Sequence, residues 1–180
     1  IYSSLNENGR AAIVLDTGAA SRGSGSLGSN KEKDCRKWFV DNDLIEGVIY
    51  LPENLFYNTS APGIIIFLNK SKQNKNKIYL LHAGKLYEKG DPKNYIPEEN
   101  LEHIANTFKT FKEEEKLARF VDIAEIIKND YNISPSRYIQ INETEIYRPL
   151  GEILDELSAL EEEALFIDTE LKSILKKIGA

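Results

Sequence analysis

The chain has 180 residues, of which 41% are hydrophobic and 29% charged, the composition of a soluble globular protein. No apolar run approaches the ~18 residues of a membrane-spanning helix, the first residues lack a signal-peptide pattern, and Cys35 is the single cysteine, so we expect a cytoplasmic protein without disulfide or membrane. The net charge of −6, set in part by an acidic C-terminal tail, argues weakly against a nucleic acid partner.

The first predicted strand is the apolar run of residues 11–15, which we expect to be buried on both faces of a sheet. Residues 16–30 are rich in glycine and serine and indicate a loop. A helix is predicted to begin at Ser29 or Asn30, either of which is a suitable N-cap, and to end at residues 42–43.

Three further strands are predicted at residues 44–51, 63–68 and 78–82, and the second of these should again be buried on both faces. The order strand, helix, strand, followed by two more strands, indicates one βαβ unit and then hairpin-like pairing. We therefore expect an α/β domain over residues 1–84 whose far edge is antiparallel.

Beyond residue 84 the pattern becomes helical, and we expect a helical or irregular extension over residues 85–145. Pro97 stands where a helix would start, and apolar residues from Leu101 to Phe111 mark one face of it. A short helix at residues 123–128, with Asp122 as a cap, precedes an irregular stretch at residues 130–137.

The last segment, residues 146–180, shows the clearest periodicity in the chain. Apolar residues alternate at spacings of three and four, which predicts a long coiled-coil-like helix that associates with another chain or folds back on residues 101–111. The positions of this stripe are Leu150, Ile153, Leu157, Leu160, Ala164, Ile167, Leu171, Ile174 and Ile178.

Residues 23–28 match the pattern G-x-G-x-x-G, between a predicted strand and a predicted helix. The first glycine follows the strand by eight residues, too far for the tight turn of a dinucleotide site. A surface loop is the simpler interpretation, and a loop that touches DNA phosphates through its flanking basic residues is the alternative. The basic residues concerned are Arg22, Lys31 and Lys33.

Two other groups of residues have side chains that could form sites. His82 and His103 have no cysteine or carboxylate array at metal-ligand spacing, so structural roles are expected for both and no metal is predicted. Phe56 and Tyr57 follow the second strand and either fold back into the core or form an aromatic wall for a nucleobase. The local sequence alone favours the core.

The stretches G-R-A-A-I-V-L-D-T-G-A (residues 9–19), R-K-W-F-V-D-N-D-L-I-E-G-V-I-Y-L-P-E-N-L-F-Y-N-T (36–59) and P-G-I-I-I-F-L-N-K (62–70) resemble the modification subunits of type I restriction-modification enzymes. So do Y-E-K-G (87–90) and the block 129–138. The resemblance implies the C-terminal half of a Rossmann-like class I methyltransferase sheet. It also implies S-adenosylmethionine-dependent methylation of adenine N6 in DNA, with specificity and restriction subunits and a second modification subunit as partners.

Two motifs on which the family's chemistry depends do not occur here. There is no Pro-Pro pair anywhere, and the glycine pattern follows the wrong strand. The chain also lacks methionine and opens on what resembles the end of a helix, so we expect a fragment that is inactive and binds no cofactor by itself. No catalytic or cofactor-binding residue is predicted.

What the resemblance does carry over is a target-base pocket, at Asn54, Phe56 and Tyr57, which reverses the preference for a core role of Phe56. An adenine must leave the duplex to be methylated, and stacking on an aromatic ring holds it outside. Two alternatives remain: a non-catalytic assembly module acting through the C-terminal helix, and a DNA-binding module acting through the basic segment 22–37.

Overall fold

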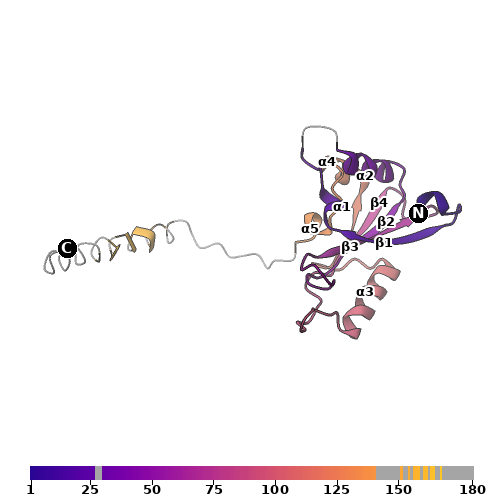
Figure 1. Cartoon of the computed structure of the whole chain (residues 1–180). Helices are drawn as coiled ribbons and strands as arrows, with labels where there is room; N and C mark the ends of the chain where they lie inside the picture. Colours follow the sequence, from indigo (N-terminus) through magenta and orange to yellow (C-terminus); the bar gives the residue numbers. More distant parts are fainter. Residues whose placement is uncertain are drawn as a thin grey trace. The chain divides into compact units, whose positions relative to one another are not determined.

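The computed structural model describes residues 1–26 and 30–140, together with residues 151, 154, 156–158, 160, 161, 163, 164 and 167. The chain divides into two compact units, Ile1–Ile141 and Asn142–Ala180. The first contains a five-stranded sheet in the order β1-β3-β2-β4-β5 (Figure 1). Its strands are β1 (Arg10–Asp16), β2 (Ile45–Tyr50), β3 (Gly63–Asn69), β4 (Lys77–His82) and β5 (Ala118–Asp122).

Strand direction places three strand ends at one edge of this sheet. β3 is antiparallel to both β1 and β2, so β1 and β2 are parallel although they are not neighbours. β4 is parallel to β2, with Tyr50 opposite His82. The carboxyl ends of β1, β2 and β4 therefore share an edge with Gly63, the first residue of β3. The antiparallel far edge was predicted within residues 1–84, but β4, the last strand of that range, is parallel to β2; the antiparallel edge strand is β5, which pairs with β4 and lies outside the range.

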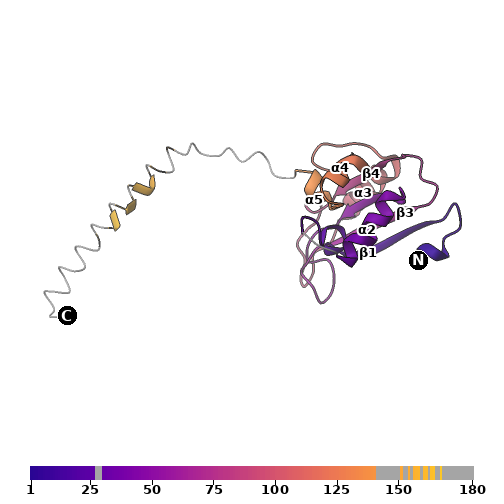
Figure 2. The same ribbon diagram turned by 90° about the horizontal axis from the view of Figure 1, so that it is seen from above.

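The prediction that the first strand is buried on both faces is wrong for this structure. β1 pairs only with β3 and lies along the outer margin of the sheet, beside the N-terminus (Figure 2). Val14 is 56% exposed and Leu15 39%. Its apolar sequence suits an inner strand, but no described strand pairs with its other side. β3, by contrast, is largely buried, as predicted.

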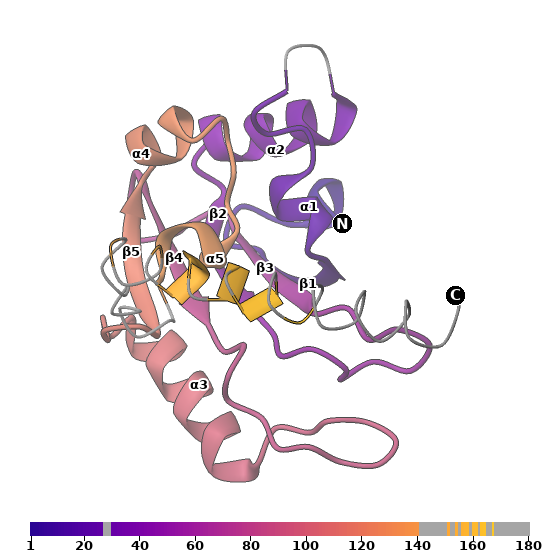
Figure 3. The same cartoon turned by 90° about the vertical axis from the view of Figure 1, so that its left-hand side faces the viewer.

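Helices cover both faces of the sheet (Figure 3). The helices of the first unit are η1 (Tyr2–Ser4), α1 (Gly18–Ser21), α2 (Lys31–Asp41), α3 (Glu98–Thr110), α4 (Ile123–Lys128) and α5 (Pro135–Tyr138). One core lies beneath α1, α2 and α4 and includes Val40 and Ile126. The other lies beneath α3 and includes Ile104 and Tyr79. None of the helices in the described part of the chain is both long and apolar enough to span a membrane.

The positions of the helix caps were predicted from the sequence more accurately than the pairing of the strands. The Asn30 side chain accepts hydrogen bonds from the backbone N–H groups of Glu32 and Lys33, which caps α2. Pro97 stands immediately before α3, as predicted. β5 was not predicted, and α1 and α5 lie in stretches predicted to be irregular; each has only four or five residues, too few for a clear period.

In the second unit, the described residues of the C-terminal stripe are helical. Leu157, Leu160 and Ile167 are each more than half exposed. The other large apolar positions of the predicted interface lie outside the described residues: Leu150, Ile153, Leu171, Ile174 and Ile178. A continuous coiled-coil helix thus stays a prediction.

Candidate functional site

The loop of residues 52–60 leaves the carboxyl end of β2 and returns to β3. Asn54 turns the chain with a left-handed backbone (φ 55°), a conformation that asparagine adopts more readily than most residues. Its N–H donates to the carbonyl of Ser60 at 2.9 Å, which closes the loop. Asn58 is also left-handed (φ 68°). The sequence thus folds into a compact turn that presents Phe56 and Tyr57 at the edge of the sheet.

The two aromatic residues of this loop have different surroundings. Phe56 is half-buried, and its ring lies against Gly63, where an added Cβ would come 2.7 Å from Phe56 Cε2. Tyr57 is 81% exposed. The core interpretation of the sequence therefore fails for Tyr57. The Phe56 ring approaches the sheet edge at Gly63 with Cε2 and Cζ and stays partly exposed, so part of it is open to a stacking base.

A second loop, residues 84–97, is bound to the first by five hydrogen bonds, one from the Tyr87 hydroxyl to Glu53 Oε1 at 3.4 Å and four from Lys93 and Asn94. Lys93 Nζ donates to Asn54 Oδ1 at 2.9 Å and to the Thr59 carbonyl at 3.0 Å. The backbone N–H of Asn94 donates to the Asn54 carbonyl at 3.0 Å, and Asn94 Nδ2 to the Glu53 carbonyl at 3.0 Å. The Asn54 side chain is therefore used in a contact between the two loops. Lys93 and Asn94 could not be found from the sequence, because their partners are some forty residues away.

A small pocket of about 270 Å³ opens beside these loops, at the carboxyl ends of β2 and β4, and includes Tyr50, His82 and Lys85 in its lining. The rings of Tyr50 and His82 stack with centroids 4.3 Å apart. His82 Nδ1 accepts a hydrogen bond from the Gly84 N–H at 3.1 Å, so the proton of the neutral ring is on Nε2. Burial lowers the pKa of His82 to about 4, which keeps it neutral at pH 7.

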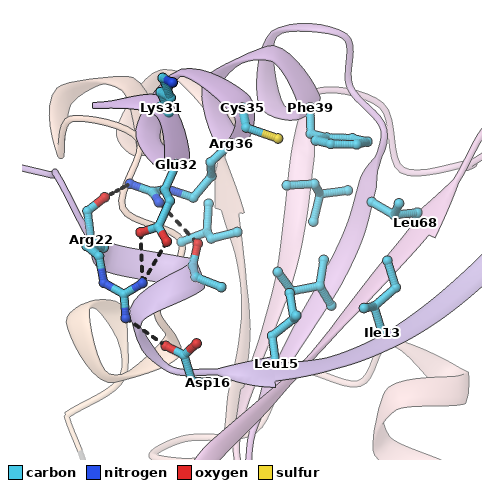
Figure 4. A pocket seen from close by; sticks show the side chains of 14 residues that line it. Ile13, Leu15, Asp16, Arg22, Lys31, Glu32, Cys35, Arg36, Phe39 and Leu68 are labelled. Atoms are coloured by element: carbon cyan, nitrogen blue, oxygen red, sulfur yellow. Dashed lines mark hydrogen bonds and ion pairs between the residues drawn. The ribbon is translucent and has the colours of Figure 1, made fainter. Parts of the chain in front are cut away.

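A larger pocket of about 410 Å³ lies between β1 and α2 (Figure 4). Its lining is largely apolar and includes Ile13 and Leu68 from the sheet and Cys35 and Phe39 from α2. At one end Arg22 bridges Asp16 at 3.1 Å and Glu32 at 2.7 Å. The pocket is thus an apolar hollow under the unpaired margin of the sheet, closed at one end by an ion-pair network.

The basic residues predicted to contact DNA differ in whether carboxylates of the chain already form ion pairs with them. Arg22 is held by two carboxylates, and its hydrogen bond with Glu32 raises its pKa. Lys33 Nζ pairs with Asp130 at 2.5 Å, and that hydrogen bond lowers the pKa of Asp130. Lys31 is exposed and forms no ion pair with the described residues. Of the three, Lys31 has the charge most available to a phosphate.

The glycine-rich loop does not fit S-adenosylmethionine in its described part. Gly23 and Gly25 have positive φ values (81° and 79°), but they follow α1 instead of ending a strand. The Gly25 N–H donates to Asp130 at 2.6 Å, and the buried Arg36 donates to Ser24 at 2.9 Å. In these two hydrogen bonds, groups of the loop bind residues of this chain instead of a cofactor. Nor do the described residues bring together three side chains that could hold a metal ion.

The N-6 DNA Methylase family model matches residues 1–146 of the chain. The methylase subunit of the type I restriction enzyme MjaVIII from Methanocaldococcus jannaschii is 45% identical over 175 residues, which cover 94% of this chain and 29% of that protein. The HindI methylase subunit from Haemophilus influenzae is 29% identical, over 96% of this chain and 40% of that protein.

Among solved structures, the methyltransferase subunit of a type I restriction-modification system from Streptococcus thermophilus has a TM-score of 0.68 and 34% identity, over 77% of this chain and 28% of that one. The chain spans less than half the length of each of these relatives. The predicted resemblance to type I modification subunits is confirmed, and the chain belongs to the N-6 DNA Methylase family.

Proposed function

We propose that this chain is the target-base and assembly portion of a site-specific DNA adenine-N6 methyltransferase subunit of a type I restriction-modification system. The observation that carries the proposal is the half-buried Phe56, held on Gly63 at the carboxyl edge of three parallel strands. Ligands of open α/β sheets bind at that edge. The family supplies the reaction class, and the loop supplies the stacking surface that an extruded adenine requires.

The catalytic and cofactor-binding residues belong, on this proposal, to a part of the complete subunit outside this chain. β1 has an apolar sequence, an unpaired margin and the 410 Å³ apolar pocket beside it. An edge of this kind is normally covered. The relatives are more than twice as long as this chain, so we assign the covering strand and helices to the remainder of the subunit. S-adenosylmethionine would bind in that remainder, and the 180-residue chain alone would be inactive.

Assembly is the second part of the proposal. Leu157, Leu160 and Ile167 are exposed on described helical residues of the C-terminal unit. Apolar side chains at this spacing are typical of an interhelical contact. We assign them to contacts with the specificity subunit or a second modification subunit, in a complex that also contains DNA and the restriction subunit.

The test uses the complete subunit, assembled with its partners, and a DNA duplex that contains its site. Phe56→Ala removes the stacking face, worth roughly 1–3 kcal/mol, and should lower the methylation rate about tenfold or more. Phe56→Tyr keeps an aromatic face and should retain most of the activity. Thermal unfolding of each variant shows whether the substitution has also destabilised the core. A rate that falls only in proportion to stability, or not at all, would assign Phe56 to packing instead.

A further inference from the structure

The Lys93 ammonium joins the two sides of the loop that carries Phe56. Its two oxygen partners, Asn54 Oδ1 and the Thr59 carbonyl, lie on either side of Phe56 and Tyr57 in the chain. Lys93 is half-buried and forms no ion pair with any described residue. An ammonium has three N–H donors, and burying it without partners costs free energy. The bonds to the two loop oxygens offset that cost for Lys93.

The loop has few other means of staying ordered. Tyr57 is exposed, as are residues 58–60, so little apolar surface is buried there. Asn54 and Asn58 both adopt left-handed backbones, which cost energy outside glycine. Segments with few buried contacts and exposed hydrogen bonds open easily. The four hydrogen bonds from Lys93 and Asn94 therefore add to the Asn54–Ser60 backbone bond in keeping the Phe56 loop ordered.

The loop that supplies these bonds is itself well anchored. Glu88 and Tyr95 pair across its base with backbone hydrogen bonds of 2.9 and 3.1 Å. The Leu86 N–H donates to the Ala83 carbonyl at 2.9 Å, directly after β4. Lys93 is therefore presented from a closed loop attached to the sheet, and Figure 3 shows this loop beside the one that follows β2.

We propose that Lys93, supported by Asn94, is a positioning residue for the target base. It holds the Phe56 loop closed so that the ring is already in place when the adenine leaves the duplex. The inference rests on the proposed function of Phe56, and Lys93 acts through that ring. Preorganisation of this kind raises the rate because no ordering is needed at the time of reaction.

The experiment measures methylation by the complete subunit in its complex on a duplex with adenine at the target position. Base stacking is measured on a second, matched duplex with 2-aminopurine at that position, which cannot be methylated because it has no N6 amino group. Lys93→Met keeps the length of the side chain and removes its charge and donors. We expect the rate constant at saturation to fall about tenfold, which is the effect of losing hydrogen bonds to one charged group. The fluorescence of the extruded base should rise because stacking on Phe56 is lost. The KM for S-adenosylmethionine should not change.

Two matched variants separate this role from general effects. Lys89→Met removes a charge from an exposed residue of the same loop, next to Glu88 at its base, and should leave all readouts unchanged. Lys93→Arg restores the donors and should recover most of the rate. In a Phe56→Ala background Lys93→Met should cause little further loss, because two residues that act through one contact are not additive.

Three results would overturn the proposal. One is a Lys93→Met rate equal to that of the parent. Another is full additivity with Phe56→Ala. The third is a smaller salt dependence of DNA binding with unchanged 2-aminopurine fluorescence, which would make Lys93 a phosphate contact. If Phe56→Ala lowers methylation while Lys93→Met does not, the positioning role fails and the proposed function of Phe56 stands. If Phe56→Ala has no effect, the proposed function fails first.

Discussion

The ring of Phe56 rests on Gly63, and a Cβ at position 63 would come 2.7 Å from Phe56 Cε2 and 3.2 Å from Cζ. This contact joins the loop after β2 to the first residue of the next strand in the chain. Glycine at position 63 therefore determines where the ring lies, because any side chain there would occupy the same space. The relationship makes the position of the ring testable without altering the ring itself.

Gly63→Ala should displace Phe56 and lower methylation by the complete subunit about tenfold, because a small misplacement at a reacting site has a large effect on rate. Overpacking should cost about 1–3 kcal/mol of stability. Rate and thermal unfolding are measured together. Ser60→Ala, in the exposed part of the same loop, is the control. Unchanged methylation in Gly63→Ala would mean that the ring position does not matter for the reaction.

His82 should make stability depend on pH in the acid range. Its folded pKa of about 4 lies below its ordinary value of 6.5, so between these values the unfolded chain binds a proton that the folded protein does not. Stability is present in full above pH 6.5 and is lost as the pH falls toward 4, by about 3 kcal/mol. Denaturant unfolding from pH 4 to 7 measures this slope. His82→Phe keeps a ring against Tyr50 and should flatten it; an identical slope in both proteins would contradict the assignment.

Lys72 is a buried cation that depends on one carboxylate. Its side chain is 1% exposed, pairs with Asp43 and donates to the Ile45 and Lys77 carbonyls at 3.0 and 2.8 Å. Asp43→Asn preserves the left-handed backbone (φ 55°) but removes the ion-pair partner of the buried charge, and should reduce the free energy of unfolding by about 3 kcal/mol. Adding Lys72→Met should recover part of the loss. Denaturant titration measures the free energy of unfolding of each variant. An unchanged stability of Asp43→Asn would show that the Ile45 and Lys77 carbonyls are enough to stabilise the Lys72 charge.

The basic segment gives a prediction for DNA binding. Lys31→Gln should reduce the slope of log K against log salt by about one for the assembled complex, because an exposed lysine that contacts one phosphate releases about one ion. Lys33→Gln should mainly remove the ion pair with Asp130. If Lys31→Gln leaves the slope unchanged, the segment is not part of the DNA surface.

Introducing charged side chains into the apolar stripe tests whether the C-terminal unit forms an interface. Leu157→Asp combined with Leu160→Asp should abolish association with the specificity subunit or with a second copy, because each buried leucine contributes ~1.5–3 kcal/mol. Light scattering and co-purification give the stoichiometry. Glu156→Gln with Glu161→Gln, on described residues of the same segment, is the control. Association that survives both leucine substitutions would place the interface elsewhere.

Local features of the fold could be predicted from the sequence, and relations between distant segments could not. The Asn30 cap, the start of α3 after Pro97 and the burial of β3 depend on neighbouring residues and were predicted. The insertion of β3 between β1 and β2, which places Gly63 beneath Phe56, depends on strand order. Apolar runs do not encode strand order, because burial on both faces looks the same in any central strand.

The candidate site shows the same division. Phe56 was found through the resemblance, whereas its local sequence favoured the core. Lys93 gave no signal, since a lysine in a polar loop looks solvated until its partners are known. Arg22 and Lys33 are basic in sequence, yet carboxylates that approach them in space match most of their charge.

The placement of β1 also bears on how the chain is made. β1 leaves the ribosome before α2 and β2, and its antiparallel partner β3 follows only after both. During that interval its apolar run can pair with the same run of another nascent chain. Arg10 and Asp16 stand at its two ends, where stacking identical strands in register would bring like charges together. We therefore expect these two residues to act as gatekeepers against aggregation during synthesis, whatever they contribute to the folded protein.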